Sequence, residues 1–254
     1  MLAKSKTFKE LTLTVVIPTY NEKDNVRPLI ALLDETLQTI VWEVVFVDDD
    51  SPDGTADEVR QIARKRENVR VIHRVGRRGL SGACIEGILS SSAPFAAVMD
   101  GDLQHDERIL VSMLAALEKD SDVDLVVGSR NVSGGSVGSG LTKIRSLGSD
   151  VATILARRLL KITVKDPMSG FFMVRLESFR GVVEELQMQG FKILTDLLSA
   201  SRGGWKVIEI PFVFKERKFG ESKMDSAVTL EYFGLILARL SRGRVIIRFI
   251  LFLF

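Results

Sequence analysis

Phe95-Ala96-Ala97-Val98-Met99 runs directly into Asp100-Gly101-Asp102-Leu103-Gln104-His105. The first half is a short apolar run, typical of a strand buried in a parallel sheet. If the second half continues in extended form, alternate residues project to one side, so Asp100, Asp102 and Gln104 offer oxygen atoms toward one point. Two carboxylates and an amide suit a hard cation such as Mg²⁺ or Mn²⁺, which in proteins usually also binds substrate phosphates.

The same residues have a simpler interpretation. Asp and Gly are ordinary turn residues, so Asp100-Gly101-Asp102 also fits a turn that only follows a strand. The surrounding sequence has to decide between a turn and a metal site.

Apolar runs of strand length alternate with amphipathic stretches on both sides of this segment. We expect strands at residues 13–18, 43–48, 69–73, 95–99 and 124–128, and helices at residues 24–37, 55–66, 80–89 and 107–117. This order predicts an α/β fold with a mostly parallel, doubly wound sheet. Polar clusters follow three of the strands, at residues 19–22, 48–51 and 100–104. Ligands of such sheets bind beyond the carboxyl ends of the strands, so the three clusters predict one shared site.

The common phosphate-binding loops are absent from the sequence. No Gly-x-Gly-x-x-Gly follows the first strand, and there is no P-loop. A nucleoside would instead lie against Tyr20, with acceptors at Glu22 and at Asp48 or Asp49. Its phosphates would meet the metal and basic side chains, for which the candidates are Arg130, Arg145, Arg217 and Lys223.

Composition narrows the class of protein. The 254 residues are 46% hydrophobic and 27% charged, which is typical of a globular chain. The net charge of +2 suggests no nucleic-acid partner. The single cysteine, Cys84, lies in a helix-like apolar stretch and is expected to be a packed core thiol.

The C-terminal residues differ from the rest. Residues 239–254 contain four arginines and no acid, and the chain is nearly all apolar from Val245 onward. We expect residues 1–224 to form the catalytic domain. We expect residues 225–254 to form a membrane-proximal helical segment that is truncated before or within a transmembrane region. The alternative is a buried C-terminal helix with a basic cap.

Together these motifs resemble the dolichol-phosphate (polyprenol-phosphate) mannose synthases, which are inverting, metal-dependent glycosyltransferases of the GT-A fold. The resemblance covers residues 12–225. It rests on the following segments: residues 16–22 (Val-Ile-Pro-Thr-Tyr-Asn-Glu), 47–55 (Val-Asp-Asp-Asp-Ser-Pro-Asp-Gly-Thr), 100–105, 128–130 (Gly-Ser-Arg), 166–172 (Asp-Pro-Met-Ser-Gly-Phe-Phe), 209–211 (Glu-Ile-Pro), Arg217 and 220–224 (Gly-Glu-Ser-Lys-Met).

The resemblance implies roles for individual residues. It implies that Asp100, Asp102 and Gln104 organise the metal, with Asp102, Arg130 and Arg217 as the catalytic residues. The residues implied to bind the nucleotide sugar are Pro18, Tyr20, Glu22, Val47, Asp48, Asp49, Asp100, Gln104, Arg130, Arg145, Arg217 and Lys223. Three positions depart from the family pattern: Asp50 replaces Gly or Asn, Asn131 replaces an aromatic residue, and Asp106 replaces a frequent proline.

The implied reaction transfers mannose from GDP-mannose to dolichyl (polyprenyl) phosphate with Mg²⁺ or Mn²⁺. It places the protein at a membrane surface, with its catalytic domain facing the cytoplasm. A phosphate monoester is largely ionised near neutral pH, since its second pKa is about 6, so no strong general base is needed. The alternatives are a UDP-sugar donor such as UDP-glucose with the same acceptor, and a catalytically silent nucleotide-sugar-binding subunit. A processive polysaccharide synthase would need a Gln-x-x-Arg-Trp signature, which the sequence lacks.

Overall fold

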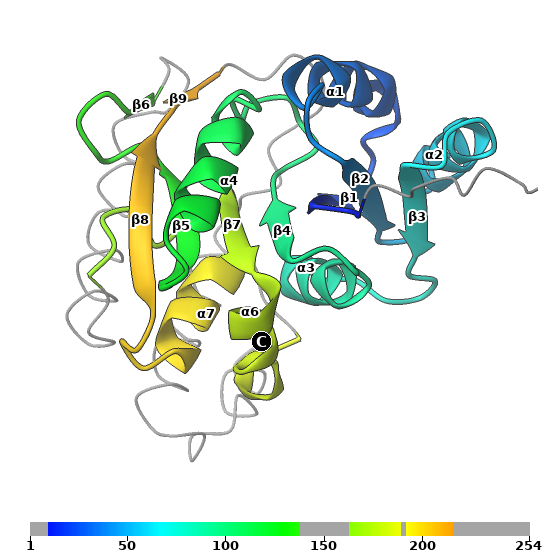
Figure 1. Ribbon diagram of the computed structural model, residues 1–254. Coiled ribbons are helices and arrows are strands. Elements are labelled where there is room, and N and C mark those ends of the chain that lie inside the picture. The colour runs from blue at the N-terminus through cyan, green and yellow to red at the C-terminus, as the bar shows by residue number, and fades with distance from the viewer. Residues whose placement is uncertain (1–9, 138–162, 189–191, 216–254) are drawn as a thin grey trace, which may run out of the picture.

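The computed structural model describes residues 10–137, 163–188 and 192–215 of the chain, in which seven strands form one sheet and two form a short ribbon (Figure 1). The strands are β1 (Leu13–Thr19), β2 (Trp42–Asp48), β3 (Val69–His73), β4 (Phe95–Val98), β5 (Val123–Ser129), β6 (Ser136–Val137), β7 (Phe172–Arg175), β8 (Lys206–Pro211) and β9 (Val213–Phe214). The helices are α1 (Lys23–Thr36), α2 (Thr55–Ala63), α3 (Leu80–Leu89), α4 (Ile109–Lys119), α6 (Leu176–Arg180), the 3₁₀ helix η1 (Val183–Glu185) and α7 (Ile193–Ala200).

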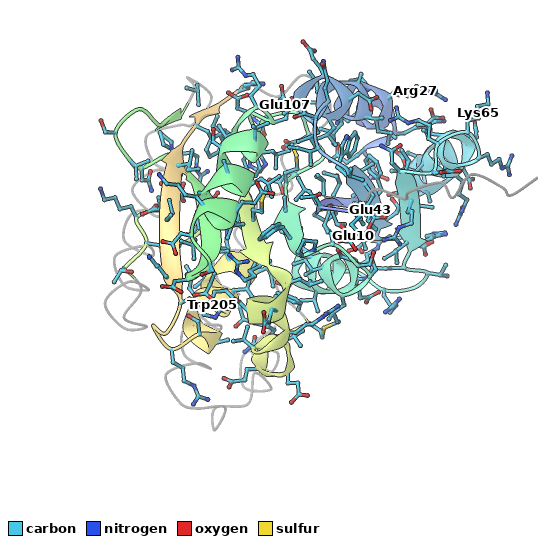
Figure 2. All side chains as sticks on the ribbon, viewed as in Figure 1. Glu10, Arg27, Glu43, Lys65, Glu107 and Trp205 are labelled. Carbon is cyan, nitrogen blue, oxygen red and sulfur yellow. The ribbon has the colours of Figure 1, made fainter. Side chains whose placement is uncertain are left out.

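The sheet has the strand order β3-β2-β1-β4-β7-β5-β8, and in Figure 1 it runs from β3 on the right to β8 on the left. Within the described residues, β7 pairs antiparallel with both β4 and β5, whereas the other neighbours in this sheet pair in parallel. In Figure 2, Trp205 marks the end of the molecule where β8 begins, and Glu107 lies near the opposite end. The mostly parallel sheet expected from the sequence is therefore confirmed.

The alternation of side chains along the strands builds two cores. Val15 and Ile17 of β1 pack with α1, α2 and α4, whereas Val16 between them packs with α3, α6 and α7. Both sets are fully buried, which explains why β1 and β2 read as continuous apolar runs and not as alternating ones. The α1 helix buries Val26, Leu29, Ile30 and Leu33, a spacing that places them on one helical face.

The expected elements up to residue 129 are confirmed, with ends that move by a few residues. The helix expected at residues 107–117 begins at Ile109, because the preceding residues form a turn in which the backbone oxygen of Asp106 accepts the N–H of Ile109 (3.2 Å). No strand was expected at β7, because its antiparallel place depends on pairing with β4 and β5, which are distant along the chain. Cys84 is fully buried, as expected.

The expected membrane-proximal segment at residues 225–254 lies outside the described residues. Among the helices that the structure describes, none combines the length and the apolar character that crossing a membrane requires.

Gly87 allows α3 to pack directly against the sheet, and this generates a stability prediction. A Cβ atom there would overlap Cγ1 of Val16 and lie 3.0 Å from Cγ2 of Val47. We expect Gly87→Ala to lower the free energy of unfolding by about 1–3 kcal/mol, despite the better helix propensity of alanine. Urea unfolding measures this change. The control is Leu89→Ala at an exposed position of the same helix, and equal stability of the two variants would contradict the close packing.

Candidate active site

Residues 100–105 form a turn at the centre of the sheet. Strand β4 ends at Val98, and Leu103 takes a left-handed conformation with φ of 63°. Oδ1 of Asp102 accepts the backbone N–H of Gln104 (3.1 Å), which fixes the reversal. The expectation that these residues share one side of an extended strand is therefore wrong. The chain must turn back toward α4, so Asp100, Asp102 and Gln104 are placed by a turn and not by strand periodicity.

His105 closes this turn by a hydrogen bond to Asp100, the first residue of the turn. Its Nδ1 accepts the backbone N–H of Asp100 (3.1 Å), and its ring stacks on Phe171 with the centroids 4.9 Å apart. Phe212 and Phe214 contact the ring through their edges. Burial in this aromatic cluster lowers the pKa of His105 to about 4, so the imidazole is neutral near pH 7. His105 is thus a structural support of the turn, and its Nδ1 is already used as an acceptor.

Gly170 forms a cradle for the Asp100 carboxylate. A Cβ atom at residue 170 would lie 3.0 Å from Oδ2 and 3.1 Å from Oδ1 of Asp100, so only glycine leaves room for the carboxylate in this position. Gly101 similarly lies close to β1, where a Cβ would be 3.3 Å from Cγ2 of Ile17. The turn is therefore packed against both neighbouring segments.

Gln104 is held by the segment that follows β9. Its Nε2 donates to the backbone oxygen of Lys215 (3.0 Å), and its own backbone oxygen accepts the N–H of Lys215 (2.8 Å). Because Nε2 is the donor, the amide orientation is defined, and Oε1 is the atom that a cation would use. Nζ of Lys215 also contacts Oε2 of Glu107 (3.1 Å).

The donor atoms of this turn fit a hard divalent cation. Asp100 and Asp102 supply carboxylates, of which that of Asp102 is buried, and Gln104 supplies an oriented amide. The described residues contain no group of three or more His, Cys, Asp or Glu side chains that could hold a metal. Mg²⁺ is usually bound by one or two carboxylates that share it with substrate phosphates, and the two carboxylates and the amide of this turn match that donor set.

Arg130 lies beyond the carboxyl end of β5 and is fixed by a bidentate ion pair. Its Nε and Nη2 donate to the two oxygens of the buried Asp166 at 2.8 and 2.9 Å, and its backbone N–H donates to Oδ2 at 3.1 Å. Burial opposes the charge, but Asp166 raises the pKa of Arg130 above its usual value. The carboxylate of Glu209 on β8 accepts the backbone N–H groups of Lys165 and Asp166, which positions the loop that carries Asp166.

The expected nucleoside residues lie at the ends of β1 and β2. Pro18 and Val47 are paired in register, and the Val47 side chain is part of the core beside α3. Asp48 is fully buried, and its oxygens accept the Ser51 hydroxyl (2.6 Å) and backbone N–H (3.0 Å). Asp49 accepts the N–H of Gly79 (2.7 Å) and pairs with the buried Arg74.

Tyr20 and Glu22 complete this side of the sheet. The guanidinium of Arg78 lies over the Tyr20 ring, 4.6 Å from its centroid. Oε2 of Glu22 accepts Nδ2 of Asn25 (2.6 Å), which ties Glu22 to the first turn of α1. The structure therefore brings Tyr20 and Glu22 to the same edge of the sheet as Asp100.

The three departures from the family pattern have structural explanations. Asp50 has φ of 58°, a left-handed conformation that Gly and Asn adopt most easily, and its carboxylate accepts His73 Nε2 (2.9 Å). Asp106 pairs with Arg108 and accepts its backbone N–H just before α4. Asn131 donates from Nδ2 to the backbone oxygen of Lys165 (3.2 Å).

Arg145, Arg217 and Lys223 lie outside the described residues, so the structure does not place them. Sequence reasoning gave no separate roles to Asp166, Gly170 and Glu209, and it missed Lys192. The sequence could have pointed to Lys192 by its position directly before the apolar helix α7. A cation is unfavourable at a helix N-terminus, so a lysine there is unusual.

The Gly170 cradle predicts the effect of a single added methyl group. Gly170→Ala should displace the Asp100 carboxylate and weaken Mn²⁺ binding by about tenfold or more, as changes next to metal ligands do. Isothermal titration calorimetry with Mn²⁺ measures this effect. Gly181→Ala, whose Cβ would meet Ser178 O at 3.3 Å, is the control away from the turn. Unchanged Mn²⁺ affinity in Gly170→Ala would show that Asp100 is not a ligand.

The burial of His105 predicts a loss of stability in mild acid. The unfolded chain takes up a proton at this imidazole near pH 6.5, whereas the folded protein does so only near pH 4. Stability should therefore fall by roughly 3 kcal/mol between these two pH values. Unfolding of the metal-free protein should show this fall in the wild type and lack it in His105→Gln. Parallel stability curves for the two proteins would contradict it.

The comparisons with known proteins agree with this geometry. The profile of glycosyl transferase family 2 matches residues 14–183. A dolichol-phosphate mannosyltransferase from Pyrococcus furiosus is 41% identical over 224 residues, which are 87% of this chain and 62% of that protein. The enzyme of the same name from Mycosarcoma maydis is 35% identical over 94% of this chain and 83% of its own length.

Among solved structures, glucosyl-3-phosphoglycerate synthase from Mycobacterium tuberculosis is similar in fold, with a TM-score of 0.69 and 18% identity over 91% of this chain and 80% of that chain. The GT-A glycosyltransferase fold expected from the sequence is thereby confirmed. The chain spans less than two thirds of the archaeal relative but most of the fungal one. On the family profile and on these relatives, the chain belongs to glycosyl transferase family 2 and, within it, to the dolichol-phosphate mannosyltransferases.

Proposed function

We propose that this protein transfers mannose from GDP-mannose to dolichyl or another polyprenyl phosphate, with Mg²⁺ or Mn²⁺ and with inversion at the anomeric carbon. The observation that carries the proposal is the turn at residues 100–105, which presents two carboxylates and an oriented amide at the centre of the sheet. Relatives named for this activity support the same reaction.

The two sides of the turn suit the two substrates. Toward β1, β2 and β3 lie Tyr20, Glu22 and Asp48, the residues expected to bind the nucleoside. Toward β7, β5 and β8 lies Arg130, fixed by Asp166. This arrangement allows the donor diphosphate to lie at the turn with its nucleoside on one side and the acceptor on the other.

Asp100, Asp102 and Gln104 would hold the metal. Structures of glucosyl-3-phosphoglycerate synthase with Mn²⁺ and UDP, and with Mg²⁺ and UDP, support the use of such an ion on this fold. When bound, the cation supplies electrostatic stabilisation of the negative charge that develops on the leaving diphosphate. The protein's own part is to orient the ligands, which the His105 and Lys215 hydrogen bonds do.

The acceptor needs no strong general base. Its phosphate oxygen is already largely ionised near neutral pH, because the second pKa of a phosphate monoester is about 6. His105, the only imidazole in the turn, is not placed as a base, because its Nδ1 already accepts the N–H of Asp100. Displacement by a phosphate oxygen from the face opposite the leaving group inverts the anomeric carbon.

Two anionic substrates require cations to bring them together. Arg130 is one such group, and we propose Arg145, Arg217 and Lys223 as further ones. The backbone oxygen of Lys215, two residues before Arg217, accepts a hydrogen bond from the Gln104 side chain. We further propose that residues 225–254 bring the domain to a membrane surface, where the lipid acceptor resides, with the catalytic domain facing the cytoplasm.

A donor panel tests the function. GDP-mannose, UDP-glucose and UDP-GlcNAc are each incubated with dolichyl phosphate and Mn²⁺ or Mg²⁺, and labelled sugar in the lipid extract is measured. We expect lipid product from GDP-mannose only when the metal is present, and a loss on addition of EDTA. Lipid product from UDP-glucose alone would overturn the mannosyl assignment, and no product from any donor would favour a silent binding subunit.

Substitution of a proposed metal ligand sharpens the test. Asp102→Ala should lower kcat by about 100-fold or more, because the stabilisation of the leaving diphosphate is lost. Asp122→Ala, at an exposed position before β5, is the matched control and should keep wild-type activity. Far-ultraviolet circular dichroism and thermal unfolding check that both variants fold. Wild-type turnover by folded Asp102→Ala would refute the metal assignment.

A further inference from the structure

Lys192 is a half-buried cation that belongs to neither the metal turn nor the Arg130–Asp166 ion pair. It directly precedes α7, and its backbone oxygen accepts the N–H of Asp196 (3.1 Å). The first turn of α7 is fixed to the loop that carries Asp166, because the Thr195 hydroxyl donates to the backbone oxygen of Pro167 (2.7 Å). Lys192 is thereby held beside the loop that runs from Asp166 to Gly170.

The charges that act on Lys192 are those of the candidate active site. They are Arg130, Asp100 and Asp166. Burial, reinforced by the charge of Arg130, holds the pKa of Lys192 below its usual value, while Asp100 and Asp166 oppose this shift. The ammonium group therefore lies within electrostatic reach of both the metal turn and the Arg130 ion pair.

None of the described residues supplies a partner for the Lys192 ammonium group. No hydrogen bond or ion pair within 4.0 Å joins its Nζ to them, in contrast to Arg130, whose guanidinium is paired with Asp166. A cation is also unfavourable at the N-terminus of α7. A half-buried lysine in such a place is costly unless an anion compensates its charge.

The binding of a metal would increase this need. The described charges at this place are the carboxylates of Asp100, Asp102 and Asp166 and the cations Arg130 and Lys192, so a divalent cation would turn a small net negative charge into a net positive one. A divalent cation at Asp100 and Asp102 would compete with Lys192 for the negative charge of Asp100. Lys192 would then require another anion nearby.

The position in the sheet indicates which anion this is. The expected nucleoside residues lie beyond β1, β2 and β3, on one side of the turn that follows β4. Arg130 follows β5, Asp166 and Gly170 precede β7, and Glu209 lies on β8, all on the other side. Helix α7 also packs against α3 on the first side, but the Thr195–Pro167 hydrogen bond and the charges of Arg130 and Asp166 join Lys192 to the second group. Its anion is therefore expected beside Arg130.

We infer that Lys192, together with Arg130, binds the phosphate monoester of the lipid acceptor and holds it beside the metal turn. This inference rests on the proposed function, since it assigns the acceptor subsite of that reaction. Arg130 is oriented by Asp166 and Glu209 and suits two phosphate oxygens, whereas Lys192 acts as a point charge. The pair overcomes the repulsion between the acceptor phosphate and the donor diphosphate.

Lys192→Met tests the inference, because it removes the charge and keeps most of the length of the side chain. We expect the KM for a short-chain isoprenyl phosphate to rise by about tenfold or more, as loss of a charged hydrogen bond does. The KM for the nucleotide-sugar donor and the affinity for Mn²⁺ should stay within about twofold of wild type. Lys119→Met, at an exposed position in the last turn of α4, is the matched control and should change none of these values.

Three results would overturn the inference. One is an unchanged acceptor KM in a folded Lys192→Met variant. Another is a rise in the donor KM alone, which would assign Lys192 to the donor diphosphate. The third is a change confined to the melting temperature or to Mn²⁺ affinity, which would reduce Lys192 to a counter-charge for Asp100.

A binding experiment separates failure of this inference from failure of the proposed function. Isoprenyl phosphate is titrated by calorimetry into the full chain saturated with GDP and Mn²⁺, which occupy the donor subsite. Binding that is about tenfold weaker in Lys192→Met supports the acceptor subsite even if no donor gives lipid product. Equal binding by the variant and the wild type, or no binding by the wild type, overturns it.

Discussion

The hydrogen bond from the backbone N–H of Asp100 to Nδ1 of His105 is the contact on which the candidate site depends. It closes the turn that follows β4, and it is effective because His105 is buried among Phe171, Phe212 and Phe214 and stays neutral. A charged imidazole could not keep Nδ1 as an acceptor. The aromatic cluster thus fixes the position of the carboxylates that would hold a metal.

On the side of the turn toward β5, β7 and β8, two carboxylates position the backbone and one arginine. Glu209 holds the loop at Asp166, and Asp166 holds Arg130. At the end of β2, Asp48 and Asp49 similarly accept hydrogen bonds from Ser51, Gly79 and Arg74. Several acids that look like ligands in the sequence therefore orient the loops, and the substrates would be met by the groups that those loops carry.

The fold was largely predictable because the strands are buried on both faces. Val15, Val16 and Ile17 are all apolar whichever core they enter, so the run stands out in the sequence without knowledge of its neighbours. Strand β7 was not predictable in this way, because its antiparallel place between β4 and β5 depends on long-range pairing. The geometry of residues 100–104 was predicted wrongly, since strand periodicity cannot reveal a left-handed residue such as Leu103.

The sequence by itself determined the order of the elements up to residue 129, the family and the chemical character of the turn, because these follow from local apolar periodicity and from short motifs. Only the tertiary structure decided that Gly170 makes room for Asp100 and that Glu209 and Asp166 position Arg130. It also decided that Lys192 lies within electrostatic reach of Asp100 and Arg130. Asp100, Asp166, Lys192 and Glu209 lie on separate segments of the chain. Their encounter depends on the packing of β7, β8 and α7 around one loop, which no local pattern in the sequence specifies.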